Sequence, residues 1–179
     1  MKAIKAGLAG ALLVAGLGLA PALPAAAATT APYCGITWGS LADSHGSSSS
    51  ARVTGVRTGE HACFDRLVVD LKGKVKGYDV KYVNAVRTEG QGRRVPLTGA
   101  ADLQILVASP ASTSYAPAHR TKAADVTGYR TFGQVAYLGS FEGRSSFGLG
   151  VRARLPFRTF VLDGPGTGSR LVIDVAHRW

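Results

Sequence analysis

The 179-residue sequence predicts an all-β protein whose antiparallel strands close into a sandwich or a barrel. After Ala51, short runs rich in Val, Tyr, Phe and Thr alternate with Gly, Pro and polar clusters at intervals of roughly ten residues, as strands and turns do. In "FGLGVRARL" (147–155) every second residue is apolar, the spacing of a half-buried strand. No sustained helical period follows the N-terminal apolar run.

Residues 1–28 have the order of a secretory signal peptide. Lys2 and Lys5 precede an apolar run at 6–20, and "PALPAAAA" supplies small residues for cleavage after Ala28. A retained membrane anchor is the alternative, but two prolines and an Ala/Gly-rich composition suit a lipid-spanning helix poorly. We therefore expect an exported protein without a membrane span after cleavage.

Residues 29–50 are expected to form an N-terminal segment that ends in a flexible serine-rich linker, "SHGSSSS" at 44–50. Cys34 and Cys63 are the only cysteines of the chain. Outside the cytoplasm such a pair most simply forms a disulfide, the alternative being two free thiols. The bridge would tie the segment to a single domain at 51–179 and stabilise it by roughly 3 kcal/mol.

The strands expected in this domain number seven or eight. The clearest runs are, in order, 61–71, 77–86, 101–108, 133–141, 147–155, 157–163 and 170–177. In the run at 147–155 the polar face carries Arg152 and Arg154. The loop "DGPGTGS" at 163–169 is expected to be a turn between strands, because a strand and no helix follows it.

Two of these strands echo each other: "RLVVDL" (66–71) and "RLVIDV" (170–175). In each, an arginine and an aspartate lie four residues apart and point to the same strand face. An antiparallel register with Val68 opposite Val172 would set Arg66 against Asp174 and Asp70 against Arg170. Each pair would contribute about 0.2–1 kcal/mol, and a chance likeness between two ordinary strands is the alternative.

The charge of the chain is strongly positive, +10 in all. Two of its 21 Lys and Arg and none of its 11 Asp and Glu lie in the expected signal, so the mature charge is 19 − 11 = +8. A basic exported protein meets anionic surfaces such as cell-wall polymers, teichoic acids or lipid head groups. The basic residues are scattered along many segments, so we expect no nucleic-acid partner, and a merely positive surface is the alternative interpretation.

The connection at 109–133 is the first candidate for ligand binding, because a structureless connection of this length is uncommon in a compact domain. It interleaves aromatic and cationic side chains, which suit sugar rings and acidic groups. The candidate ligand-binding residues are Tyr115, Arg120, Lys122, Tyr129 and Arg130, with Arg152 and Arg154 as a second candidate. The alternative is a solvated loop whose tyrosines only hold it in place.

No motif indicates an enzyme or a metal site. The four histidines, at 45, 61, 119 and 177, have no metal-pair spacing, and a zinc site needs three or four converging ligands. A Ser/His/Asp triad forms in space rather than in sequence, but "GRSSFG" is not a nucleophile elbow. We expect no catalytic residues, no metal and no cofactor.

The order of several short motifs resembles the AMIN-like domain of exported actinobacterial proteins. The features are Phe64-Asp65-Arg66 entering an apolar strand, Gly77-Tyr78 opening the next, "FGLG" from Phe147, "PFR-x-F" at Pro156 and the closing "RLVIDVAH". The resemblance covers 53–177 and implies an antiparallel β-sandwich related to the AMIN domain, which localises cell-wall amidases and secretion components, in some cases by binding peptidoglycan. It implies no catalytic residues.

We therefore expect a secreted, non-catalytic domain associated with the cell envelope, whose partner is a cell-wall polymer, either peptidoglycan or teichoic acid. The alternatives are a small secreted hydrolase acting on envelope material and a protein-interaction module without glycan affinity. The sequence leaves open the binding face, the oligomeric state, and whether the protein is released or retained in the wall.

Overall fold

The computed structural model describes residues 32–179, and the predicted signal peptide lies outside the described residues. The described part is all-β, as predicted, with nine strands rather than seven or eight. Its elements are η1 (Tyr33–Gly35), β1 (Asp43–Gly46), β2 (Arg52–Glu60), β3 (Phe64–Lys72), β4 (Gly77–Val83), β5 (Ala101–Val107), η2 (Arg120–Lys122), β6 (Phe132–Phe141), β7 (Arg144–Val151), β8 (Phe157–Asp163) and β9 (Ser169–Ala176).

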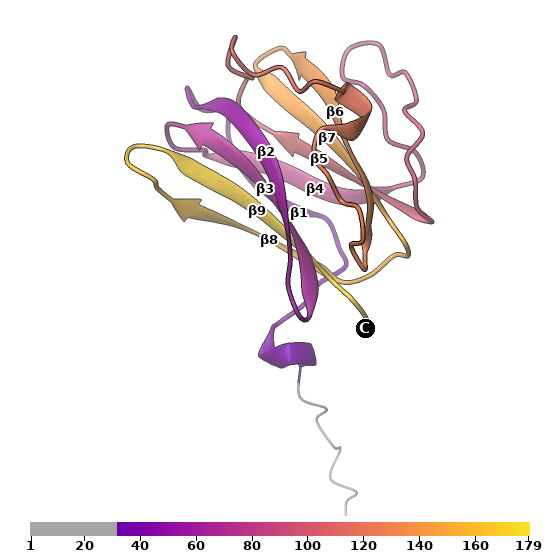
Figure 1. The fold of residues 1–179 in the computed structure, drawn as a ribbon. Helices are drawn as coiled ribbons and strands as arrows, with labels where there is room; N and C mark the ends of the chain where they lie inside the picture. The colour runs from indigo at the N-terminus through magenta and orange to yellow at the C-terminus, as the bar shows by residue number, and fades with distance from the viewer. Residues whose placement is uncertain (1–31) are drawn as a thin grey trace, which may run out of the picture. The chain divides into compact units, whose positions relative to one another are not determined.

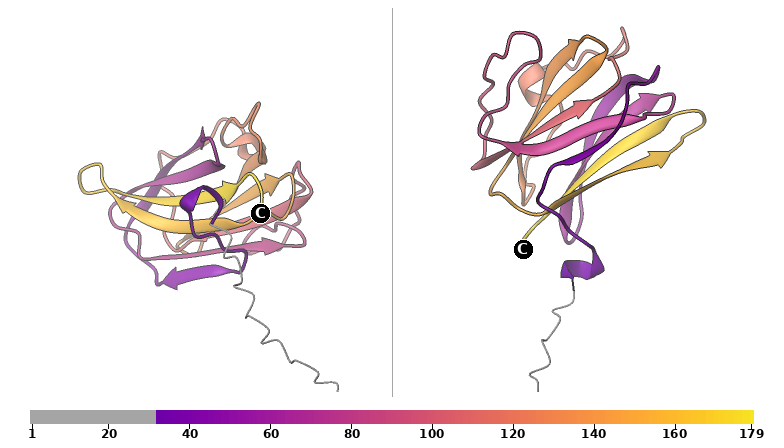
Figure 2. Two further views of the ribbon diagram at one scale, coloured as in Figure 1. Left: turned by 90° about the horizontal axis from the view of Figure 1, so that it is seen from below. Right: turned by 180° about the vertical axis from the view of Figure 1, so that it is seen from behind.

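The strands form two antiparallel sheets that lie as two layers of a sandwich (Figure 1). One sheet has the order β1-β4-β5-β7-β6, and the other has the order β2-β3-β9-β8. The 3-10 turn η1 lies at one end of the four-stranded sheet, near the C-terminus (Figure 2). This arrangement rules out a barrel and establishes the sandwich.

The core lies between the sheets and is built by period-2 alternation. Along β3, Leu67, Val69 and Leu71 point inward, and they meet inward residues of β5, β7 and β9 such as Ile105 and Phe147. These side chains are almost completely buried. Their apolar area supplies the main driving force for folding.

The strand predicted at 147–155 differs most from the structure, because β7 ends at Val151. Its second face, expected to be wet, is buried beneath the connection 84–98, which adds a small core around Val86. An added Cβ on Gly148 would lie 2.9 Å from Val86, and one on Gly150 would collide with the Thr98 carbonyl. The glycines therefore allow this connection to lie directly on the sheet.

The connection at 109–131 closes one side of the sandwich. It runs between two edge strands, with bridges from Ala111 to Val53 of β2 and from Ala124 to Val135 of β6. Thr58 of β2 donates a 2.7 Å hydrogen bond to the Asp125 carbonyl. This segment is therefore ordered packing rather than a free loop.

The serine-rich stretch 44–50 is not the free linker that its composition predicted. Its first residues belong to β1, where Ser44 faces Asp79 and Gly46 faces Gly77. Further along, the Ser49 backbone N–H donates to the Ala108 carbonyl at 3.0 Å. Backbone pairing with β4 thus outweighs the weak local preference of a serine run.

No helix within residues 32–179 has the length and apolar character that a membrane crossing requires.

Candidate functional site

The outer face of the four-stranded sheet carries a cluster of charged and aromatic side chains. Strands β3 and β9 pair with Val68 opposite Val172, which sets Arg66 opposite Asp174 and Asp70 opposite Arg170. This register is the one that the sequence echo predicted. The residues on this face, together called the arginine–aromatic face, are Arg57, Phe64, Arg66, Asp70, Arg158, Phe160, Arg170 and Asp174.

Asp174 is a fully buried carboxylate between two arginines. Arg66 donates to its two oxygens at 2.6 and 2.9 Å, and Arg158 of β8 donates to it at 2.8 Å. The hydrogen bond to Asp174 raises the pKa of the Arg66 guanidinium above its ordinary value. One carboxylate between two guanidinium groups leaves one positive charge unbalanced.

The second predicted ion pair, between Asp70 and Arg170, does not form although the two residues lie opposite each other. Asp70 accepts a two-pronged contact from Arg57 of β2, at 2.9 and 3.2 Å. Arg170 instead donates to the Asp163 carbonyl at 3.0 Å, and its Nε has no hydrogen-bond partner in the described chain. The Asp70 carboxylate therefore pairs with a side chain of β2, a strand that the sequence echo did not include.

Aromatic rings separate and orient the guanidinium groups. The Arg66 guanidinium lies 5.2 Å from the centroid of the Phe64 ring and 5.6 Å from that of Phe160. The Arg158 guanidinium lies 5.1 Å from the centroid of Phe160. These are cation–π distances, so the rings attract and help to position the arginines.

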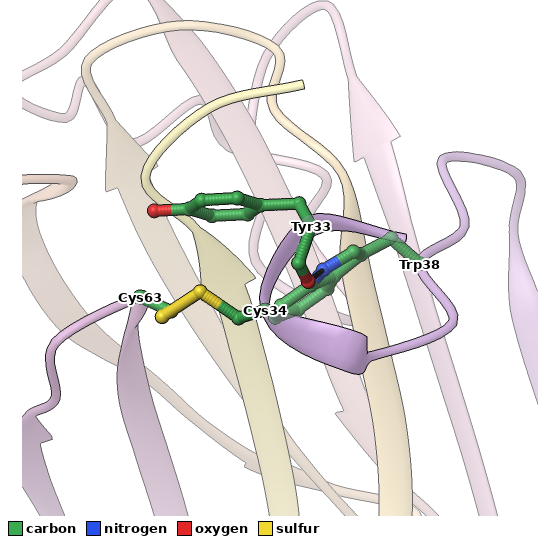
Figure 3. Close-up of a disulfide and its surroundings, with 4 residues drawn as sticks. All are labelled: Tyr33, Cys34, Trp38 and Cys63. Carbon is green, nitrogen blue, oxygen red and sulfur yellow. Dashed lines mark hydrogen bonds between the residues drawn. A yellow bond between two sulfur atoms is a disulfide. The ribbon is translucent and has the colours of Figure 1, made fainter. Parts of the chain in front are cut away.

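The N-terminal segment adds a third ring to this face. Trp38 meets Phe64 edge-on with 6.0 Å between ring centroids, and the Arg158 guanidinium lies 5.5 Å from the Trp38 ring. The Cys34–Cys63 disulfide fixes the segment beside β3, and the Trp38 indole N–H donates to the Tyr33 carbonyl at 3.0 Å (Figure 3). The predicted disulfide therefore positions part of the face.

Opening the disulfide is expected to lower the free energy of unfolding by about 3 kcal/mol, because the bridge restricts the unfolded chain across 29 residues of separation. The test is guanidinium unfolding of the double variant Cys34→Ser, Cys63→Ser against the oxidised protein. The reduced wild-type protein is the matched control and should show the same loss. Equal midpoints for oxidised and reduced protein would contradict this expectation.

The residues predicted in the long connection do not form one site. Tyr115 meets Tyr137 edge-on at 5.1 Å, and Tyr129 stacks on Phe132 at 6.1 Å, so both tyrosines pack against the core. Burial raises the pKa of Tyr115. The two rings therefore hold the segment in place, which was the alternative interpretation.

The cations of the same connection point to different places. The Arg120 guanidinium lies 5.2 Å from the Tyr137 ring and lines a hollow of about 480 Å³ beside Phe141. Lys122 lines another hollow, and Arg130 lies 3.5 Å from the Glu60 carboxylate. The three cations therefore do not line one common surface.

The second candidate, Arg152 and Arg154, lies after β7 rather than on a strand face, which corrects the prediction. Arg152 donates to the carbonyl of His177, so it holds the C-terminus. The Arg154 guanidinium lies 4.9 Å from the Tyr82 ring. Burial raises the pKa of Tyr82 to about 12.

Asp65 and His177 form a buried polar pair for which the sequence indicated no role. Asp65 accepts hydrogen bonds from the backbone N–H groups of Thr131 and Phe132, at 2.6 and 3.1 Å. The His177 Nε2 lies 3.0 Å from its other oxygen. The pair joins β3, the start of β6 and the C-terminal segment. His61, the other unassigned residue, stacks on Phe64 at 4.5 Å.

Within residues 32–179, no group of three or more His, Cys, Asp and Glu side chains is arranged to hold a metal ion.

The family model of the AMIN-like domain matches residues 51–177, and the chain belongs to this family. AMIN-like domains are generally non-catalytic binding modules associated with the cell envelope. Comparisons with curated proteins and with solved structures gave no match.

Proposed function

We propose that the protein is exported and binds peptidoglycan or another anionic wall polymer through the arginine–aromatic face. The observation that carries the proposal is the charge of this face. The face carries four arginines and only two aspartates. Arg66 and Arg158 share the carboxylate of Asp174, and Arg57 pairs with Asp70. Arg170 pairs with no carboxylate within the described chain.

The chemistry of the face suits a polymer of sugars and acidic groups. Guanidinium groups recognise carboxylates and phosphates through paired N–H donors. Phe160 and Trp38 offer ring faces or edges near these donors, and apolar sugar faces stack on such rings. The Cys34–Cys63 disulfide and the basic N-terminus followed by an apolar run support export.

The test is retention of the protein on purified peptidoglycan, with and without teichoic acid, over a salt series. We expect retention at low salt on peptidoglycan stripped of teichoic acid, and part of it should persist at moderate salt. Loss of all retention at moderate salt would indicate charge alone. No retention at low salt would end the proposal, and turnover of wall fragments would favour the hydrolase instead.

Arg170→Gln is expected to weaken retention roughly fivefold, because a charged contact contributes about 1 kcal/mol. Arg170 has an unpartnered Nε within the described chain and carries no salt bridge there. The matched control is Arg144→Gln, which removes the same charge from an exposed position on the five-stranded sheet. Equal weakening by both variants would show that net charge, rather than this face, drives retention.

A further inference from the structure

The side of the sandwich opposite the long connection exposes an unpaired strand edge. The edges of β2 and β6 are covered through Ala111 and Ala124, and β1 is only four residues long. At the fourth edge, β8 pairs outward only at its first residue, where Phe157 and Gly39 exchange backbone hydrogen bonds. No described residue pairs with the outward backbone groups of Thr159 and Val161.

The bond with Gly39 fixes which residues of β8 point outward. In an antiparallel ladder, alternate residues direct their N–H and C=O groups to opposite sides of the strand. Because Phe157 bonds to Gly39, the residues that point away from β9 are 157, 159, 161 and 163. Three alternate residues, Thr159, Val161 and Asp163, thus direct backbone groups to this edge, where the Asp163 carbonyl already accepts from the Arg170 side chain.

The surroundings of this edge are apolar and open. Val161 and Leu162 are 38% and 36% exposed, unusual values for large apolar residues in this domain. Beside them lies a groove of about 520 Å³ lined by Val75, Tyr78, Thr159, Phe160 and Val161, together with His45 and Lys76. A long unprotected edge of this kind is a template for strand addition.

We propose that a second copy of this chain pairs with β8, antiparallel and about a two-fold axis at Val161. This register sets Val161 against Val161, Phe160 against Leu162, and Thr159 against Asp163 of the other copy. It joins two apolar residues on the outer face, and it places a carboxylate opposite Thr159, whose hydroxyl is buried without a partner in the described chain. The strand is thus complementary to itself, as a two-fold contact requires.

The pairing would join two four-stranded sheets into one. Each copy would contribute the outward N–H and C=O groups of the same three residues, so the ladder is reciprocal. The Asp163 carbonyl, which already accepts from Arg170, would accept with its second lone pair. The two arginine–aromatic faces would then lie on one continuous sheet surface. Because both copies are strongly basic, the dimer should strengthen when added salt screens their repulsion.

Sedimentation equilibrium of the purified protein over a concentration and salt series tests the proposal. We expect a monomer–dimer equilibrium that shifts toward dimer with salt. Val161→Lys, which places a charge at the centre of the edge, should raise the dimer dissociation constant about tenfold or more. The control Leu41→Lys makes a similar apolar-to-lysine change at an exposed site outside β8 and should leave it unchanged.

Cysteine cross-linking tests the register itself. Residues opposite each other in a hydrogen-bonded antiparallel pair lie about 5.5 Å apart between Cα atoms, which suits a disulfide. Val161→Cys should therefore give a disulfide-linked dimer under mild oxidation, whereas Leu162→Cys, which faces residue 160, should not. A monomer at all concentrations up to about 1 mM, or cross-linking by Leu162→Cys alone, would overturn the proposal. Wall retention that persists in Val161→Lys separates this proposal from the preceding one.

Discussion

Replacing Asp65 with alanine is expected to lower the free energy of unfolding by about 4 kcal/mol. The substitution removes the acceptor of two buried backbone N–H groups, those of Thr131 and Phe132, and the partner of the buried His177 ring. Buried donors that lose their acceptor pay the full desolvation penalty. Guanidinium unfolding with the disulfide intact measures the loss.

The matched control is Asp163→Ala, since that carboxylate is exposed and pairs with Lys74 at the surface. It should change the stability by no more than about 0.5 kcal/mol. Asp65→Asn should fall between the two, because the amide oxygen keeps one acceptor. An Asp65→Ala protein as stable as the control would show that these buried hydrogen bonds contribute nothing to stability.

Asp65 also shows where prediction from the sequence stops. Alternation along β3 correctly places Asp65 with the inward residues. The role of an inward carboxylate, however, cannot be predicted until its hydrogen-bond donors are known. Those partners lie 66, 67 and 112 residues further along the chain. A pattern within one strand cannot predict contacts between residues so far apart in the sequence.

The paired strands at 66–71 and 170–175 show how much of the candidate site could be predicted from the sequence. Their shared pattern predicted the register and the contact between Arg66 and Asp174, and the structure has both. It could not show that β2 and β8 flank the pair, so Arg57 and Arg158 were missed as partners. The alternation of Arg158 and Phe160 in "FRTFVLD" was the available signal, and it needed the strand order to become a site.

The long connection has a composition that resembles that of a binding loop, although its residues do not converge on one site. Tyr115 and Tyr129 are half-buried against the core, whereas Arg120 and Lys122 between them are exposed. Interleaved aromatic and basic residues are expected in a binding loop. The same pattern is expected in a segment whose rings pack against the core while its charged side chains face water. Burial, which depends on tertiary packing, decides between the two.

Replacing Asp174 with leucine is expected to destabilise the protein by about 4 kcal/mol, because Arg66 and Arg158 would then face each other without a shared carboxylate. Part of this loss should be recovered at high salt, since both guanidinium groups are partly exposed and their repulsion can be screened. Guanidinium is itself a salt, so urea unfolding at low and high NaCl is the suitable measurement.

A compensated variant separates this charge effect from simple loss of packing. With Arg66→Met and Arg158→Met added, the Asp174→Leu protein should regain most of its stability, because a whole ionic cluster replaced by apolar residues is often neutral. The same triple variant removes two arginines of the arginine–aromatic face and should retain the fold while losing wall retention. If the triple variant is no more stable than Asp174→Leu alone, shape rather than charge explains the loss. If it folds and is retained on peptidoglycan like the wild type, the face is not the binding surface.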